Sequence, residues 1–219
     1  PQTQMTRFDS ETLLKQKRGL RQTMTAGGNV VISSDKAGVS PQLIDARYAS
    51  TDFLPMFDLP LRFGRGWTAS EDEAKARVVV VSKELNEARF GGSDSTGKTL
   101  RIDDNDFRII GVLDKWRLVP RFYDLYNDNY GITESVFLPF STSRELKMGN
   151  QGNTNCWADS GGDSRGLNAP CAWMQYWVEL ESAGKAGDYR RYLMNYSDQQ
   201  RAAGRFERPT NVRLRNVME

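Results

Sequence analysis

The clearest hydrophobic pattern in the chain is a run of four valines, 78–81, that lies between the polar residues Arg77 and Ser82. β-Branched residues favour strands, and an apolar run without alternation is typical of a strand that is buried on both faces. Ser82 is a good helix cap, and the helical pattern after it runs to about Phe90, where two glycines follow. The pattern therefore predicts a buried strand followed at once by a helix.

Shorter patterns predict the remaining elements. Strands are expected where β-branched residues cluster or alternate with polar ones, and helices where apolar residues recur every three or four positions. The expected strands are 29–33, 43–48, 99–103, 107–113, 135–138, 175–181 and 210–215. The expected helices are 10–24, closed by two glycines, 52–57, a short one from about 141, and 188–203 with Asp188 as cap, whereas 61–67 is expected to be irregular and 68–75 polar. This mixed order favours an α+β fold.

Residues 116–177 differ in composition from the rest of the chain. They hold four of the five tryptophans and 11 of the 23 aromatic residues, and they include a polar, glycine-rich stretch, 149–170. Most of these aromatic residues are expected to pack in the core. An exposed subset could instead form a partner or ligand surface, because tryptophan and tyrosine are frequent interface hot spots. The candidates for this surface are Trp116, Tyr123, Tyr126, Tyr130 and Trp157.

The two cysteines, Cys156 and Cys171, lie at the far part of this stretch. Two thiols in a chain without histidine make a poor zinc site. Joined, they would close a short loop and stabilise the fold by about 3 kcal/mol in the chain-entropy model. A disulfide would also indicate an oxidising compartment. We favour the disulfide, with two reduced thiols as the alternative.

Charge and composition exclude several classes of function. The chain has 30 basic and 28 acidic residues, so its net charge of +2 gives little reason to expect nucleic acid as a partner. It has no histidine, which excludes Ser-His-Asp and Cys-His catalysis and histidine-based zinc sites. No apolar run approaches the roughly 20 residues of a membrane helix. The acidic segment 103–106 is expected to be a hairpin turn, with a cation site as the alternative.

Residues Gly92–Thr99 match the P-loop pattern G-x-x-x-x-G-K-[ST]. A working P-loop leaves a strand and opens a helix, so that backbone N–H groups meet the phosphates. Here the string follows a helical pattern and enters a strand pattern, and no apolar strand that ends in an acidic residue offers a partner for Mg²⁺. We therefore interpret it as a helix-to-strand turn with a solvated Lys98, and reject an NTPase.

Six short strings between about residues 43 and 112 carry a family resemblance. They read DARYASTDFLPMF, LRFGRGW, RVVVVSKEL, ARFGG, TGKTLRI and FRIIGV, and begin at residues 45, 61, 77, 88, 96 and 107. In this order and spacing they resemble the periplasmic core domain of MacB-type, or FtsX-like, ABC transporter permeases. The string FLPF at 137–140 and the expected final strand, helix and strand resemble the same family less specifically.

The resemblance implies a division into two subdomains. A split, porter-like subdomain would comprise 1–42 and 172–219, and an inserted, mainly β, sabre-like subdomain would comprise 43–171, including the cysteine-bracketed loop 149–171. The domain would lie in the periplasm, between two transmembrane helices of an inner-membrane permease. Both chain ends would then lie at one end of the domain. The resemblance implies no catalytic residue and no cofactor or metal.

The implied role is to transmit ATP-driven conformational change to the periplasm. The implied partners are the permease's own transmembrane helices, a second permease subunit, an ABC ATPase that is fused or separate, and a periplasmic adaptor or the substrate. The loop 149–171 looks longer than the family's usual connection, and such insertions often carry specificity. The alternatives are a lipoprotein-release or signalling permease of the same superfamily and a secreted, aromatic-rich binding module.

Overall fold

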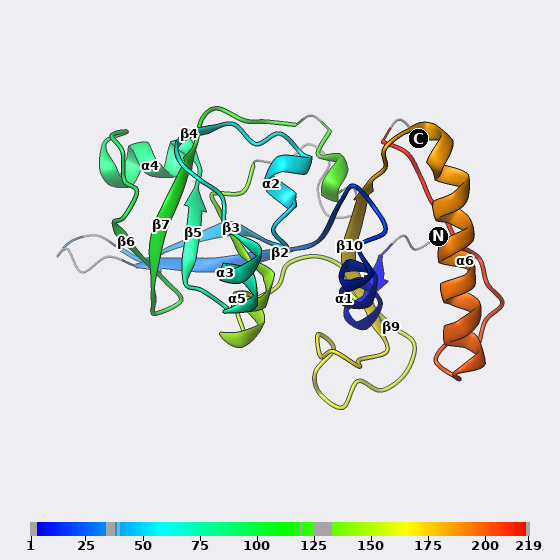
Figure 1. Cartoon of the computed structure of the whole chain (residues 1–219). Coiled ribbons are helices and arrows are strands. Elements are labelled where there is room, and N and C mark those ends of the chain that lie inside the picture. Colours follow the sequence, from blue (N-terminus) through cyan, green and yellow to red (C-terminus); the bar gives the residue numbers. More distant parts are fainter. Residues whose placement is uncertain (1–3, 34–37, 39, 119, 125–132, 218–219) are drawn as a thin grey trace.

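The computed structural model describes residues 4–33, 38, 40–118, 120–124 and 133–217 as one mixed sheet with helices at its faces and at one end (Figure 1). The strands are β1 (Met5–Thr6), β2 (Arg21–Ser33), β3 (Gln42–Ala49), β4 (Leu61–Gly64), β5 (Val78–Val81), β6 (Thr99–Ile102), β7 (Asn105–Leu113), β8 (Val136–Pro139), β9 (Asn155–Cys156) and β10 (Cys171–Glu179). The helices are α1 (Arg7–Gln16), α2 (Phe53–Met56), α3 (Ala69–Glu73), α4 (Lys83–Phe90), α5 (Phe140–Glu145) and α6 (Ala186–Ala202), with short 3₁₀ turns η1 (Phe122–Asp124) and η2 (Ala183–Lys185).

The sheet has the strand order β1-β10-β2-β3-β8-β5-β7-β4, while β6 pairs with β2 and β7, and β9 pairs with β10. The pairs β3–β8 and β5–β7 are parallel, and the other pairs are antiparallel. Helices and strands thus mix without strict alternation, and the predicted α+β class is confirmed.

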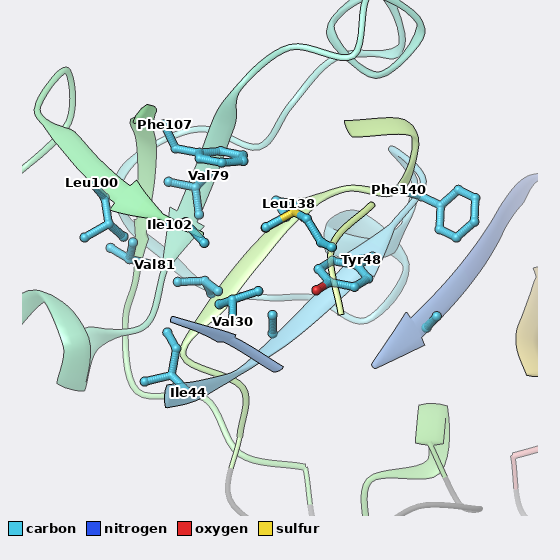
Figure 2. Packing of buried hydrophobic residues seen from close by; sticks show 14 of the residues in the cluster. Val30, Ile44, Tyr48, Val79, Val81, Leu100, Ile102, Phe107, Leu138 and Phe140 are labelled. Carbon is cyan, nitrogen blue, oxygen red and sulfur yellow. The ribbon is translucent and has the colours of Figure 1, made fainter. Parts of the chain in front are cut away.

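The four valines of β5 connect two hydrophobic cores. Val79 and Val81 belong to the first core, which also contains Tyr48 and Leu138 (Figure 2). Val78 and Val80 point the other way, into a second core that contains Phe137. Because successive side chains of a strand point to opposite faces, the uninterrupted apolar run is explained by burial on both sides, as predicted.

The long strand β2 replaces the end of a helix that the sequence predicted over 10–24. The helix α1 ends at Gln16, Lys17 adopts a left-handed backbone with φ 49°, and the strand begins at Arg21. The glycines expected to stop that helix lie inside β2. A Cβ on Gly28 would lie 2.3 Å from the ring of Tyr48, so this glycine is needed for close packing and not for a helix end.

Three other expectations need correction. The segment 61–67, expected to be irregular, contains β4, which pairs with β7. The segment 68–75 is polar as expected, and it forms α3, which is capped by reciprocal hydrogen bonds between Thr68 and Glu71. The cap of α6 is Lys185 and not Asp188, which lies in the first turn. The strand expected over 210–215 does not form, although half-buried and exposed residues alternate along it.

The two-part division, 1–42 with 172–219 against 43–171, remains a prediction. β2 takes part in both regions, because its first residues pair with β10 and the rest pair with β3. The two chain ends expected to lie at one end of the domain, Pro1 and Glu219, are outside the described residues, but Gln4 and Leu214 line the same cavity beside α6 (Figure 1). Among the described residues, no helix is both long and apolar enough to cross a membrane.

Candidate functional site

The P-loop-like string has the element order expected from the sequence. It follows α4 and enters β6, and Gly91, Gly92 and Gly97 adopt positive φ angles of 69°, 80° and 84° in the turn. The C-terminus of α4 therefore faces the string, whereas phosphate binding needs a helix N-terminus. The ammonium of Lys98 lies 5.3 Å from the centre of the Phe90 ring. The turn is confirmed, and the absence of nucleotide binding stays a prediction.

Of the five residues expected to form a partner surface, the three that the structure describes do not make one exposed patch. Tyr123 is 1% exposed and belongs to the second core, so it does not contribute to a surface. Trp116 is half-buried and stacks on Tyr123, with 5.7 Å between the ring centres. Trp157 is 56% exposed. Tyr126 and Tyr130 lie outside the described residues.

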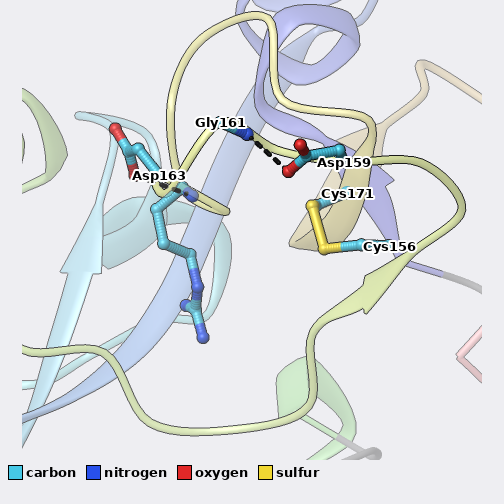
Figure 3. The surroundings of a disulfide bond; sticks show 6 residues. Cys156, Asp159, Gly161, Asp163 and Cys171 are labelled. Atoms are coloured by element: carbon cyan, nitrogen blue, oxygen red, sulfur yellow. Dashed lines mark hydrogen bonds between the residues drawn. A yellow bond between two sulfur atoms is a disulfide. The ribbon is translucent and has the colours of Figure 1, made fainter.

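The predicted disulfide between Cys156 and Cys171 is confirmed (Figure 3). The two residues face each other in the β9–β10 pair, with 4.0 Å between their α-carbons. Cys171 is buried in the first core, whereas Cys156 is exposed. The guanidinium of Arg165, within the loop, lies 4.6 Å from the ring centre of Trp173 on β10. The loop is therefore fastened to β10 by a covalent bond and by a cation–π contact.

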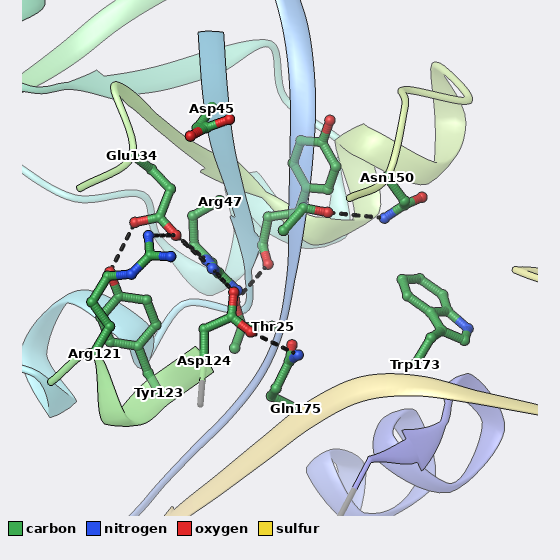
Figure 4. Close-up of polar contacts among 12 residues, drawn as sticks. Thr25, Asp45, Arg47, Arg121, Tyr123, Asp124, Glu134, Asn150, Trp173 and Gln175 are labelled. Carbon is green, nitrogen blue, oxygen red and sulfur yellow. Dashed lines mark hydrogen bonds and ion pairs between the residues drawn. The ribbon is translucent and has the colours of Figure 1, made fainter. Parts of the chain in front are cut away.

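A buried cluster of charged residues, which we call the Arg47 cluster, lies where β10 meets the rest of the sheet (Figure 4). It consists of Arg47, Arg121, Tyr123, Asp124, Glu134 and Gln175. Each of these residues is at most 8% exposed. Two arginines and two carboxylates make the cluster neutral overall, as buried charges require.

Arg47, on β3, is the centre of the cluster. Its Nε donates to Glu134 Oε1 at 3.0 Å, and its terminal nitrogen Nη2 donates to both Glu134 and Asp124. Tyr123 donates its hydroxyl to the second oxygen of Glu134 at 2.8 Å. Glu134 is also 3.4 Å from Arg121. The Glu134 carboxylate is thus shared by three side chains.

Gln175 attaches β10 to this cluster. Its side-chain nitrogen donates to Asp124 Oδ1 at 3.1 Å. Nearby, the indole of Trp177, also on β10, donates to the backbone oxygen of Tyr123 at 3.3 Å. The cluster therefore joins β10 to β3, to η1 and to the residue that leads into β8.

Electrostatics keep the cluster ionised. Burial by itself lowers the pKa of Arg47, but Glu134 and then Asp124 raise it above its ordinary value. Burial raises the pKa of Glu134, but Arg47 and Arg121 outweigh it and hold that pKa below the usual range. Burial, followed by the charge of Glu134, raises the pKa of Tyr123. A neutral Tyr123 phenol, a charged Arg47 guanidinium and a charged Glu134 carboxylate are therefore the stable arrangement at pH 7.

This chemistry suits structural attachment better than catalysis. The opposite charges are paired and lie away from solvent, although Arg47 Nη1 and Gln175 Oε1 have no hydrogen-bond partner among the described residues, so a reacting group could reach the charges only by opening the core. Among the described residues there is also no group of three acidic or cysteine ligands that could hold a metal ion.

Sequence reasoning did not identify the Arg47 cluster. Its members come from β3, from η1 and the residue before it, from the segment before β8, and from β10, and the hydrogen bonds of Arg47 span 77 and 87 positions. One signal was available. Arg47 stands between Ala46 and Tyr48 in a predicted strand. Because alternate residues of a strand point to the same face, its side chain lies on the same face as that of the apolar Ala49, as expected of a residue that points into a core.

Comparison with known proteins gives one family. The sequence model of the family described as the MacB-like periplasmic core domain matches residues 6–186. A curated relative, the macrolide export ATP-binding/permease protein MacB of Wolinella succinogenes, is 32% identical over 76 residues. That match covers 35% of this chain and 12% of the relative. The chain thus matches a small part of a much longer protein.

Solved structures support the same fold. The periplasmic region of MacB from Actinobacillus actinomycetemcomitans has a TM-score of 0.60 and 15% identity, covering 91% of this chain and 76% of that one. The extracellular domain of the transporter YknZ from Gram-positive bacteria has a TM-score of 0.58 and 14% identity, covering 91% and 85%. A permease domain from Porphyromonas gingivalis has a TM-score of 0.54 and 15% identity, covering 90% and 72%.

Proposed function

Because the chain belongs to the family of MacB-like periplasmic core domains, we propose that it transmits ATP-driven movement of a transporter to the periplasm and performs no catalysis itself. It is a periplasmic domain of the MacB/FtsX-like ABC transporters, and family membership implies membrane helices and an ATPase as partners. Inner-membrane anchoring, a second permease subunit and contact with an adaptor or substrate are parts of the proposal.

The observation that carries the proposal is the Arg47 cluster. Movement of membrane helices would enter the domain at the α6 end, where both described chain ends lie. From there, β2 and β10 lead into the sheet, and Gln175 links β10 to Asp124 and so to Arg47 on β3. A buried, hydrogen-bonded joint resists bending at this point, so that the far strands β6 and β7 move together with the α6 end.

The loop 149–171 is the part that we assign to partner contact. It carries the exposed Trp157, and the disulfide and the Arg165–Trp173 contact hold it against β10. An aromatic side chain presented on a fastened loop loses little entropy on binding, which favours a protein or substrate contact.

The test uses the intact transporter in lipid nanodiscs. A spin label on Asp104→Cys, at the exposed tip between β6 and β7, reports the distance to the same label in the second permease subunit. The native cysteines are bonded to each other and do not take the label. We expect the distance to change when ATP is trapped in the ATPase. An unchanged distance in an actively hydrolysing transporter would contradict transmission through this domain.

A second variant tests the joint itself. Gln175→Met removes the hydrogen bond to Asp124 at similar volume and leaves no extra charge buried. We expect ATP hydrolysis to persist while the label distance changes less or becomes broader. Gln199→Met, on the exposed side of α6, is the matched control and should behave like the parent. Equal behaviour of both variants would remove the Arg47 cluster from the mechanism.

A further inference from the structure

A cavity of about 580 Å³ lies between α6, the C-terminal segment that follows it, β1 and β10. This volume is within the range of small-molecule sites in proteins. The C-terminal segment runs back along α6 and closes one side (Figure 1). The cavity and the Arg47 cluster involve different residues of β10: Tyr176 and Val178 line the cavity, whereas Gln175 belongs to the cluster.

The inner lining of the cavity is mainly apolar and aromatic. Leu13 of α1, Val178 of β10 and Leu193 of α6 line it, and Val212 and Leu214 line it from the C-terminal segment. Asn211 and Arg213 line the cavity too, but they are exposed, whereas Val212 and Leu214 are half-buried, so the apolar side chains are the more buried part of this segment. This lining suits an apolar ligand body of extended shape.

The charges around the cavity have a positive excess. Asp9 is the acidic residue in the lining, and it is already satisfied: its Oδ1 accepts from Tyr196 at 2.7 Å and from Arg205 at 2.8 Å. Arg208 and Arg213 also line the cavity, are exposed, and make no ion pair with any described residue. They therefore leave two positive charges at the open side.

Tyr176 and Tyr189 also line the cavity and add to its aromatic character. Tyr189 is 5% exposed. Their buried hydroxyl groups interact with each other, so the polar recognition of a ligand falls to the charged residues of the lining.

We propose that this cavity binds an amphipathic anion, with its apolar chain against Leu193 and Val212 and its acidic group at Arg208 and Arg213. An apolar lining alone would accept any apolar molecule. Arg208 and Arg213 favour a molecule that also carries a negative charge. The proposal goes beyond transmission of movement and stands on the cavity alone.

The test compares three probes that share a twelve-carbon chain and differ in charge: dodecanoate, dodecanol and dodecyltrimethylammonium. Each is titrated into the 219-residue chain at pH 7.5 by calorimetry, below its micelle concentration. We expect dodecanoate to bind at least about tenfold more tightly than the other two. Equal binding of the cation, or dodecanoate binding weaker than about 1 mM, would overturn the proposal.

Variants then locate the site. Leu193→Trp fills the cavity and should abolish dodecanoate binding, whereas Met194→Trp is the matched control on the exposed side of α6 and should not. Replacing Arg208 and Arg213 together by glutamine should weaken dodecanoate about tenfold and leave dodecanol unchanged. Far-ultraviolet circular dichroism checks that each variant is folded. Dodecanoate binding that survives Leu193→Trp in a folded variant would place the ligand elsewhere and refute the assignment.

Discussion

The centre of the sheet and the α6 end are packed in opposite ways. In β5, all four valines are at most 3% exposed, and they fill two cores at once. In α6, with 17 residues, only Tyr189 and Tyr196 are buried, and a cavity of about 580 Å³ lies beside the helix. Shape-matched apolar packing makes the centre rigid, while hydrogen bonds and tyrosine side chains hold α6.

The contrast separates the end where movement would enter the domain from the centre that would pass it on as a unit. Few side chains interlock at the α6 end, so transmission depends on β2 and β10, which lead from there into the sheet. The centre has two discrete cores and the Arg47 cluster, and densely packed regions move as units. The predictions below test this contrast, beginning with the largest expected effect.

Removing the centre of the Arg47 cluster should be the most damaging single change. Arg47→Met leaves Asp124 and Glu134 buried with less compensating charge, and we expect the free energy of unfolding to fall by about 3–5 kcal/mol. Urea unfolding followed by tryptophan fluorescence measures it. The control is Arg21→Met, whose partner Glu179 is partly exposed, and which should cost less than about 1 kcal/mol. Similar losses in both variants would show that burial of the cluster is not what matters.

Loss of the disulfide should come next. Replacing Cys156 and Cys171 by alanine opens a loop with a sequence separation of 15, and we expect a loss of about 3 kcal/mol. Dithiothreitol should destabilise the parent by a similar amount and leave the double variant unaffected. If the parent loses no stability on reduction, the loop 149–171 is not fastened to the rigid part of the domain by this bond.

Truncation of one apolar side chain in each region compares the two directly. Val80→Ala, in the second core, should cost about 2 kcal/mol, because it removes buried methyl groups and leaves a hole. Leu193→Ala should cost less than about 1 kcal/mol, because Leu193 is half-buried and already borders a cavity. Both are measured by urea unfolding. A larger loss from Leu193→Ala would reverse the comparison.

The smallest expected effect is a loss of stability at the α6 end, and it appears only at alkaline pH. Burial raises the pKa of Tyr189 to about 12, above the value of about 10 in an unfolded chain. A raised pKa means that this stabilisation is complete below pH 10 and is lost as the pH rises from 10 through about 12. Absorbance at 295 nm and unfolding experiments between pH 9 and 12 follow the change.

Tyr189→Phe is the control for this titration, because it removes the ionisable group and keeps the ring. In this variant the free energy of unfolding should fall less steeply above pH 10 than in the parent. Titration of every tyrosine near pH 10, with no delayed group, would show that Tyr189 is not buried in solution.

Local patterns predicted the centre of the fold far better than its periphery. The valine run predicted β5, and Ser82 with the glycines at 91 and 92 predicted α4, because burial and capping are encoded within a few residues. β4 was missed because its pairing with β7 decides it. The segment 210–215 has the alternation of a strand but no described partner strand, so pattern alone was misleading there.

The Arg47 cluster could not be derived from the sequence for the same reason. Gln175 and Asp124 are 51 positions apart, and only the complete sheet brings them together. Tyr123 was expected among surface residues because aromatic residues often mark interfaces. Instead, its ring centre lies 5.4–5.7 Å from the ring centres of Phe53, Phe57 and Trp116. The disulfide was predictable, since only two cysteines are present.

The pairing of β2 with β10 also has a consequence for the order in which the chain assembles. Arg21 and Glu179 face each other in this pair, although 158 positions separate them, so the first half of β2 must wait as an unpaired edge while the intervening residues are synthesised. Contacts between such distant residues form late, and open strand edges are prone to aggregation. The first residues of β2 are therefore among the last in the sheet to find their partner strand.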